Sequence, residues 1–255
     1  MIATEGILMH TALVTGGSAG LGLALARDLA ADGWHVVVDA RDADRLAAAV
    51  GPLQGTVTAV AGDVTDPAHR EALAARALAT GRLDLLVHNA STLGPTPLPP
   101  LADLDLAGFD DAWLTNVVAP LALTQLVLPA LRDAGGILVG ISSDAAVEHY
   151  EGWGAYAASK AALDQVVLTL GAENPQIAAY AVDPGDMRTA MHQAAFPGED
   201  ISDRPLPESV LPALRTLLRT RPATGRYRAA DFAPGPAGPA DPTGPVGSSA
   251  HVVSA

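Results

Sequence analysis

The chain has 255 residues, of which 49% are apolar, 17% charged and 4% aromatic, a composition typical of a globular protein with an aliphatic core and not of a disordered or coiled-coil chain. Its 28 acidic and 15 basic residues give a formal net charge of −13, which argues against nucleic acid or an anionic membrane as a partner. The lack of cysteine excludes disulfides, thiolate metal sites and thiol catalysis, and is consistent with a cytoplasmic location.

The two ends of the chain differ from the rest. Residues 1–8 precede Met9 and lack the basic start and apolar run of an export signal, so they are expected to be a short N-terminal extension. Nine of the fifteen residues in 234–248 are Pro or Gly, which predicts a disordered tail over residues 233–255. No window approaches the roughly 18 uninterrupted apolar residues of a membrane span, so we expect a soluble protein.

Between these ends, short apolar runs alternate with Ala- and Leu-rich stretches of helical spacing. The pattern predicts, in chain order, strand 11–15, helix 21–31, strand 35–39, helix 45–50, strand 56–60, helix 68–79, strand 83–88, helix 109–131, strand 137–142, helix 156–172, strand 177–182, helix 208–219 and a last strand within 225–232. Strands this apolar are buried on both faces, and the alternation implies right-handed βαβ units. We expect one Rossmann-like α/β domain over residues 9–232, a doubly wound parallel sheet of about seven strands between two helical layers.

A glycine-rich segment, TGGSAGLG from Thr15 to Gly22, joins the first predicted strand to the first predicted helix. Glycines there let the backbone turn tightly and approach a pyrophosphate, whose charge is offset by the amides at the helix N-terminus. The alternative is a strand–helix turn without a ligand. Its position directly after a strand favours a dinucleotide site.

Ser143, Tyr156 and Lys160 form a second candidate group. Tyr156 and Lys160 are four residues apart on a predicted helix, so they project from one face, and Ser143 ends the preceding strand. A free tyrosine has a pKa of about 10, and a nearby ammonium favours the phenolate and should lower that value toward neutral pH. Together with the glycine turn, the group indicates proton transfer beside a dinucleotide.

These motifs resemble the short-chain dehydrogenase/reductase family, specifically its compact single-domain branch. From about Ala12 to about Thr189 the matches come in the family's order, with weaker similarity to Phe232: the glycine turn, Asp63 in GDVT, Asn89-Ala90 of an NAG-like motif, Asn116 in LTNV, the Ser143/Tyr156/Lys160 set, and Asp183-Pro184-Gly185 with Thr189. Six matches in the right order make coincidence negligible.

The resemblance implies a catalytic tetrad of Asn116, Ser143, Tyr156 and Lys160. Tyr156 is then the general acid or base, and Lys160 lowers its pKa and binds the nicotinamide ribose. Ser143 holds the substrate oxygen. Asn116 fixes a helix bend and a water that relays protons to Lys160. The implied cofactor contacts are Thr15, Gly16, Ser18, Ala19, Gly20, Leu21, Gly22, Arg41, Asp63, Val64, Asn89, Ala90, Tyr156, Lys160, Pro184, Gly185, Met187 and Thr189, and no metal is implied.

The choice between the two nicotinamide cofactors depends on the end of the second strand, which reads Asp39-Ala40-Arg41. In the resembled family, NAD users usually carry Asp where this chain has Ala40, and phosphate-accepting members often carry Arg where it has Arg41. A guanidinium grips a 2′-phosphate bidentately. Asp39 lies one place early and is expected to point away, although a small shift could bring it to the ribose. NADP(H) is favoured and NAD(H) stays possible.

The chain departs from the family at two points beside the expected nicotinamide. Ser91 replaces the last glycine of the NAG-like motif, and His88 replaces a frequent asparagine. His88 is interpreted as a strand-end residue packed beside the cofactor. Residues 187–207 occupy the place of the family's substrate lid.

The substrate cannot be identified from the sequence beyond a small ketone, aldehyde or secondary alcohol. The pocket candidates are Leu93, Asp144, His149, Tyr150, Trp153, Asp186, Met187 and Met191. Trp153 and the methionines favour an apolar, adaptable pocket.

Two other functions stay open. One is a non-catalytic cofactor-sensing regulator, although such proteins tend to lose the tyrosine or lysine that this chain retains. The other is the epimerase or dehydratase branch of the family, whose chains are usually longer. The helices around Asn116 and Tyr156 have enough apolar surface to predict a homodimer, with a tetramer possible.

Overall fold

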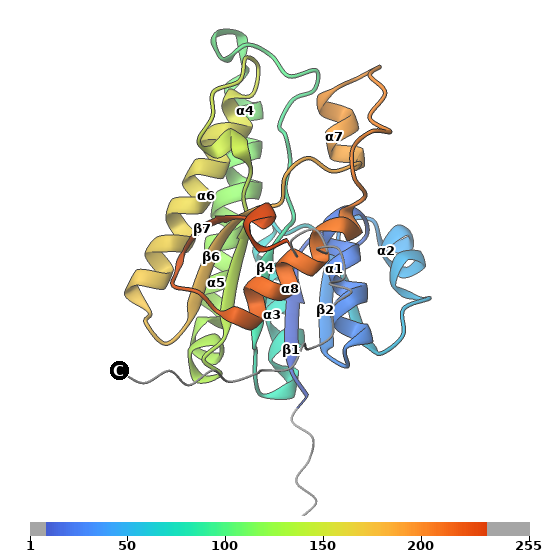
Figure 1. Cartoon of the computed structure of the whole chain (residues 1–255), viewed down its shortest axis with the longest axis vertical. Helices are drawn as coiled ribbons and strands as arrows, with labels where there is room; N and C mark the ends of the chain where they lie inside the picture. The colour runs from blue at the N-terminus through green and yellow to red at the C-terminus, as the bar shows by residue number, and fades with distance from the viewer. Residues whose placement is uncertain (1–8, 234–255) are drawn as a thin grey trace, which may run out of the picture.

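The computed structural model describes residues 9–233 of the chain (Figure 1). The predicted N-terminal extension, and all but the first residue of the predicted tail, therefore lie outside the described residues.

Seven parallel strands form one sheet in the order β3-β2-β1-β4-β5-β6-β7. The strands are β1 (Thr11–Val14), β2 (His35–Ala40), β3 (Thr56–Ala61), β4 (Leu85–His88), β5 (Ile137–Ile141), β6 (Ala178–Asp183) and β7 (Gly225–Arg228). The inner strands are buried along almost their whole length, whereas β3 and β7 at the two edges are partly exposed. The predicted doubly wound parallel sheet is confirmed, and its predicted strand ends lie within two residues of the observed ones.

Eight α-helices cover the described part of the chain. They are α1 (Gly20–Ala31), α2 (Ala43–Val50), α3 (Pro67–Ala77), α4 (Leu106–Trp113), α5 (Ala119–Asp133), α6 (Gly154–Glu173), α7 (Ala190–Ala195) and α8 (Leu211–Thr220). Side chains of α1, α2 and α8 pack in one hydrophobic cluster on one face of the sheet, and those of α3, α5 and α6 pack in another on the opposite face. These two clusters give the three predicted layers.

The predicted helix over residues 109–131 is longer and interrupted. It begins with α4, continues through a π-helical stretch, Leu114–Val118, and ends with α5. Asn116 is the middle residue of the π-helical stretch and is fully buried. Such bulges are frequent at functional sites because they turn a side chain out of the helical repeat.

By length and composition, the stretch Leu106–Asp133 could also cross a membrane, with a mean hydropathy of 1.6 over an 18-residue window. The sequence expectation considered only uninterrupted apolar runs and did not detect this window. In the fold, 44% of the window is buried, and Leu123, Val127 and Leu131 of α5 belong to the hydrophobic core. We therefore interpret the stretch as a core helix of the domain.

The carboxyl ends of the central strands lie at one edge of the sheet, uppermost in Figure 1. Val14 at the end of β1 pairs with Val38 of β2 and with Val87 of β4. The strand order reverses between β1 and β4, and open α/β sheets bind ligands at such a switch point. Helix α7, which was not predicted, stands above this edge (Figure 1).

Candidate active site

A cavity of about 420 Å³ runs along the carboxyl edge of the sheet. Its size is typical of small-molecule and cofactor sites. Among the predicted site residues, those bordering the cavity are Gly16, Ser18, Ala19, Gly20, Leu21, Arg41, Asp63, Val64, Asn89, Ala90, Ser143, Tyr156, Lys160, Pro184, Gly185, Met187 and Thr189. Thr15, Gly22 and Asn116 do not border it.

The glycine turn is shaped by its backbone. Gly16 and Gly20 have positive φ angles of 73° and 57°, which L side chains rarely adopt. A Cβ on Gly22 would lie 2.4 Å from the Gly16 carbonyl oxygen and 2.4 Å from Asn89 Nδ2. Gly22 is therefore required for close packing of α1 behind the turn, and its contact with a ligand stays a prediction. The empty space in front of the turn fits the pyrophosphate of a dinucleotide.

Thr15 also acts behind the turn. Its hydroxyl oxygen accepts hydrogen bonds from the backbone N–H groups of Asn89 and Ala90, both at 3.0 Å, and so joins the ends of β1 and β4. The Asn89 side chain donates to the carbonyl oxygens of Thr15 and Gly16 at 2.9 and 3.2 Å. Thr15 thus fixes the shape of the cavity wall, and its cofactor contact stays a prediction.

Asp63 and Arg41 lie at the same end of the cavity. Asp63 Oδ1 accepts from the backbone N–H and the hydroxyl of Thr65, both at 2.8 Å. Although burial acts in the opposite direction, these hydrogen bonds and the positive charge of Arg41 hold the pKa of Asp63 below its usual value. Arg45, which the sequence analysis did not consider, borders the cavity here too, four residues after Arg41 in the chain.

The catalytic candidates come together at the end of β5 and the start of α6. Lys160 is almost fully buried, and its Nζ lies 5.5 Å from the centroid of the Tyr156 ring. That Nζ donates a hydrogen bond to the Ile141 carbonyl oxygen at 2.7 Å. The Ser143 hydroxyl donates to Asp144 Oδ1 at 2.9 Å. Helical spacing thus places the Tyr156 and Lys160 side chains together beside the strand end that carries Ser143.

The protonation of this group differs from the sequence expectation. Burial raises the pKa of Tyr156, and Asp144 adds to the rise, while the Ser143 hydroxyl opposes it. Burial also lowers the pKa of Lys160 to about 8. The pKa of Tyr156 is thus raised in this arrangement and not lowered as expected, because desolvation disfavours the phenolate more strongly than its neighbours favour it. The phenol is kept protonated at neutral pH, as a proton donor must be.

Protein groups occupy all the hydrogen-bonding positions of the Asn116 side-chain amide. Its Nδ2 donates to the Thr92 carbonyl oxygen at 2.8 Å and to Ser159 Oγ at 2.9 Å. Its Oδ1 accepts from the Thr92 N–H at 2.9 Å and from Ser91 Oγ at 3.1 Å. An amide group makes no more than four such bonds, so this side chain has none left for the expected relay water. It instead ties the helix bulge to the loop after β4 and to the residue before Lys160.

Sequence analysis missed a buried polar network next to the lysine. Asp164 lies one helical turn after Lys160, and its Oδ2 accepts from Ser142 Oγ at 2.8 Å and from Arg226 Nε at 3.0 Å. Arg226 Nη2 also donates to the Ser143 carbonyl oxygen at 2.8 Å. The last strand thereby holds the backbone of the candidate catalytic serine. The four-residue spacing from Lys160 was a signal for Asp164, whereas nothing local indicated Arg226.

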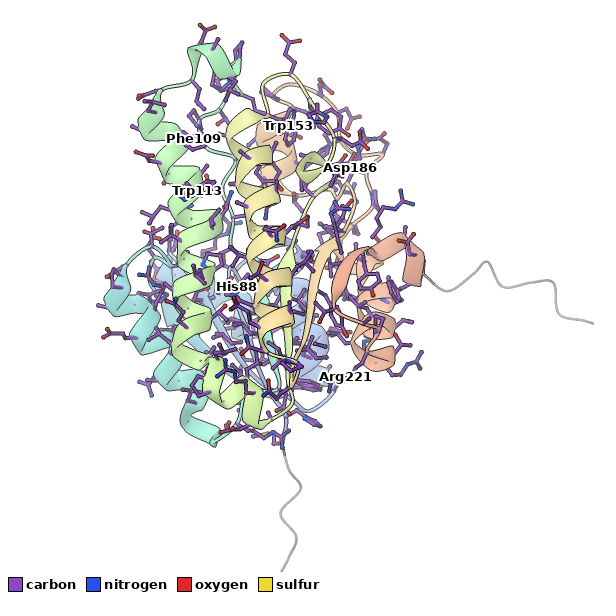
Figure 2. All side chains as sticks on the ribbon, turned by 90° about the vertical axis from the view of Figure 1, so that its left-hand side faces the viewer. His88, Phe109, Trp113, Trp153, Asp186 and Arg221 are labelled. Carbon is purple, nitrogen blue, oxygen red and sulfur yellow. The ribbon has the colours of Figure 1, made fainter. Side chains whose placement is uncertain are left out.

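His88 lies deep in the molecule, between the two long helices that face the viewer in Figure 2. Its Nε2 is 2.7 Å from the Thr124 hydroxyl oxygen, and that hydroxyl donates to the Pro120 carbonyl oxygen. Burial lowers the pKa of His88 to about 3, so the imidazole is neutral at physiological pH. His88 does not border the cavity and is a packed core residue.

The opposite end of the cavity is lined by aromatic and sulfur-containing side chains together with acidic ones. Trp153 contacts the rings of Tyr156 and Phe196, with centroid distances of 5.7 and 5.9 Å. Trp153 and Asp186 lie near the same end of the molecule in Figure 2. Of the predicted pocket residues, Leu93, Asp144, Trp153, Asp186, Met187 and Met191 border the cavity. His149 and Tyr150 do not, and line a separate depression beside α6.

Within residues 9–233, no group of three or more His, Asp or Glu side chains is arranged to hold a metal ion.

Residues 10–200 match the family model described as short chain dehydrogenase. Because the match covers most of the chain and agrees with the sheet and the strand-edge cavity, the chain belongs to the short chain dehydrogenase family, whose members are NAD(P)-dependent oxidoreductases.

Individual relatives agree with this assignment. An uncharacterized oxidoreductase of Mycobacterium tuberculosis is 41% identical over 201 residues, which cover 78% of this chain and 77% of the relative. The serine 3-dehydrogenase of Agrobacterium fabrum is 36% identical over 70% of this chain and 72% of its own length. A Shigella flexneri short chain dehydrogenase solved in complex with NADP superposes with a TM-score of 0.79 at 30% identity, covering 88% of this chain and 98% of that one.

Proposed function

We propose that the protein is an NADP(H)-dependent oxidoreductase that transfers a hydride between the nicotinamide and a small carbonyl compound or secondary alcohol. One observation carries the proposal: Ser143, Tyr156 and Lys160 border the same cavity as the glycine turn. A substrate carbonyl bound in this cavity can therefore face both the nicotinamide and the proton-donating Tyr156.

The bound cofactor supplies the hydride, and the side chains of the protein manage the proton and the orientation. Tyr156 gives its phenolic proton to the carbonyl oxygen during reduction and takes it back during oxidation. The Ser143 hydroxyl, turned from Asp144, donates to the same oxygen and stabilises the charge that develops there. The Lys160 ammonium stabilises the phenolate that is left, and its donors not used by Ile141 bind ribose hydroxyls.

The charge at the far end of the cavity supports NADP(H) as the preferred cofactor. Arg41 and Arg45 both border this end, where a 2′-phosphate would lie. The Shigella flexneri neighbour was solved with NADP. The Asp39 carboxylate, which could otherwise repel a phosphate, accepts a hydrogen bond from the Gly16 N–H at 2.8 Å.

The substrate end supports an uncharged or weakly polar substrate of modest size. Leu93 and Trp153 pack with Met191 against the Tyr156 ring in a small hydrophobic cluster. This apolar cluster can hold the hydrocarbon part of a ketone, an aldehyde or a secondary alcohol while its oxygen atom faces Ser143 and Tyr156.

The test is a panel of small ketones, aldehydes and alcohols assayed with NADPH and NADH in parallel, following the absorbance of the reduced cofactor. We expect turnover with NADPH, and a loss on the order of 10³-fold in kcat for Tyr156→Phe, because general acid catalysis is removed. Cofactor binding should be unchanged in that variant. Tight cofactor binding without turnover of any compound would favour a cofactor-sensing regulator, and comparable activity of Tyr156→Phe would refute the assigned role.

We also propose that the protein is a cytoplasmic homodimer. Trp113, Leu114, Val118 and Leu126 are each exposed by at least 38% on the α4–α5 stretch, where Figure 2 labels Phe109 and Trp113 on the helix nearest the viewer. Large apolar side chains exposed on one helical stretch are typical of a protein–protein interface. Sedimentation velocity of the full chain tests the assembly, and a monomer at micromolar concentration would contradict it.

A further inference from the structure

A buried pair of residues, Asp39 and His69, lies directly beneath the glycine turn. Asp39 Oδ1 accepts a hydrogen bond from the Gly16 N–H at 2.8 Å, and Asp39 Oδ2 lies 3.1 Å from His69 Nε2. The side chains are 1% and 5% exposed. A carboxylate only accepts hydrogen bonds, so the histidine nitrogen is the donor. Both oxygens of Asp39 thus have a donor inside the protein.

Only a glycine at position 62 makes room for the histidine. A Cβ on Gly62 would lie 2.1 Å from His69 Nδ1, closer than any real contact. His69 comes from α3 and Gly62 from the turn after β3, whereas Asp39 belongs to β2. Three segments that are separated in sequence therefore hold this pair, and of its two hydrogen bonds only the one from the Gly16 N–H comes from the glycine turn.

The position of the pair gives it a consequence for cofactor recognition. Asp39, Ala40 and Arg41 follow one another at the end of β2 and border the cavity where the adenosine ribose would lie. An acidic side chain in this region accepts hydrogen bonds from the ribose hydroxyls of NAD, and it repels a 2′-phosphate. Held beneath the glycine turn, the Asp39 carboxylate does neither, and the guanidinium groups of Arg41 and Arg45 at this end of the cavity can then meet a 2′-phosphate without its repulsion.

We propose that His69 is a positioning residue that sets the preference for NADP(H) over NAD(H) by holding the Asp39 carboxylate beneath the glycine turn. The inference rests on the proposed function only in that a nicotinamide dinucleotide binds in this cavity. The cofactor preference then depends on the contact between His69 and Asp39, and His69 lies outside the segment at the end of β2 that faces the cofactor.

The decisive variant is His69→Leu, which fills a similar volume but cannot donate a hydrogen bond. A buried carboxylate that loses one of its two donors is strongly disfavoured, and the polar space nearest to it is the cavity. We expect the carboxylate to turn toward the ribose site. The dissociation constant for NADPH should then rise at least tenfold, and that for NADH should change less than threefold. The measurement is a binding titration followed by protein fluorescence or calorimetry, independent of turnover.

Two matched variants separate this effect from loss of structure. His69→Gln keeps a side-chain N–H donor, so the ratio of the two dissociation constants should stay within threefold of wild type. In the double variant Asp39→Asn/His69→Leu the residue that turns out carries no charge, so the ratio should again be near that of wild type. A ratio that falls as far in the double variant as in His69→Leu would overturn the proposal.

If His69→Leu does not fold, as judged by circular dichroism, Asp39→Asn alone still tests the inference. An inward-facing carboxylate predicts a change below threefold in the NADPH-to-NADH ratio, and a change of tenfold or more would overturn it. The proposed function is tested separately by wild type: if it binds neither dinucleotide, the proposed function falls as well. If wild type binds and His69→Leu leaves the ratio unchanged, only the present inference falls.

Discussion

The two ends of the cavity are built in different ways. At the end next to the glycine turn, the wall is mostly backbone, set by Gly16 and Gly20 in positive-φ conformations and by the Thr15 bridge between strand ends. At the opposite end, the wall is mostly large side chains, with Trp153 of the segment before α6 resting on Phe196 after α7. The backbone that forms the glycine-turn end is fixed by the strands of the sheet. The side chains packed around the short helix α7 can adopt other rotamers.

The difference teaches that cofactor and substrate recognition can vary independently in this protein. The catalytic candidates lie between the two ends of the cavity. Lys160 donates a hydrogen bond to the carbonyl oxygen at the end of β5, and the Tyr156 ring packs against Trp153. A substitution at either end should therefore change one kind of binding and leave the other largely intact. Of the four variants below, given in order of decreasing expected effect, Gly22→Ala and Phe196→Ala test that separation, whereas Lys160→Met and His88→Asn test the buried groups between the two ends.

Lys160→Met should abolish turnover and at the same time stabilise the fold. Burial lowers the pKa of Lys160 to about 8 from an unfolded value of 10.5, so the charged form is disfavoured in the folded state at neutral pH. Removing it should raise the free energy of unfolding by about 3 kcal/mol at pH 7. The buried ammonium destabilises the fold by its full amount below pH 8, and this destabilisation disappears as the pH rises toward 10.5. Urea unfolding at pH 7 and pH 10 should therefore show a gain that shrinks with pH, and a loss of stability at pH 7 would contradict this account.

Gly22→Ala should damage the glycine turn without touching the substrate end. The new methyl group would lie 2.4 Å from the Gly16 carbonyl oxygen, so α1 must shift. We expect a loss of about 1–3 kcal/mol in stability and weaker binding of both nicotinamide cofactors. Gly51→Ala is the matched control, because Gly51 has a right-handed helical backbone at the end of α2 and a Cβ there would lie 3.1 Å from its nearest neighbour, the Ala47 carbonyl oxygen. Equal effects of the two substitutions would show that the close approach at Gly22 is unimportant.

His88→Asn should reduce the acid sensitivity of the fold. The folded-state pKa of His88 is lowered to about 3 from 6.5, so only the unfolded chain binds a proton between these values, and stability falls on acidification. The slope from this residue is about 1.4 kcal/mol per pH unit. Between pH 7.5 and 5.5 the variant should lose about 1 kcal/mol less stability than wild type, as measured by urea unfolding. His149→Asn, on an exposed loop, is the control and should behave as wild type.

Phe196→Ala should have the smallest effect, confined to the substrate end. It removes the ring contacts to Trp153 and to His192, with centroid distances of 5.9 and 4.9 Å. Loss of such a contact corresponds to about 0.5–1.5 kcal/mol, so KM for the substrate should rise roughly threefold to tenfold. The dissociation constant for the cofactor should not change, and a change there instead would contradict the independence of the two ends.

The sequence by itself determined the architecture and most of the cavity. Apolar runs alternating with helical spacing require a parallel sheet buried on both faces, and the glycine turn needs its backbone at one place in that sheet. The spacing of Tyr156 and Lys160 fixes them on one face of a helix wherever that helix lies. These features are local, so each could be predicted from a few neighbouring residues.

Only the tertiary structure decided the contacts between distant segments. Nothing near Asp39 indicates His69, and nothing near Ser143 indicates Arg226. The raised pKa of Tyr156 likewise comes from its burial, which depends on how the helices and the segment around α7 enclose the cavity. Hydrogen-bond partners and desolvation are properties of the packed chain, because they depend on which atoms exclude water at a point in space and not on the order of residues along the backbone.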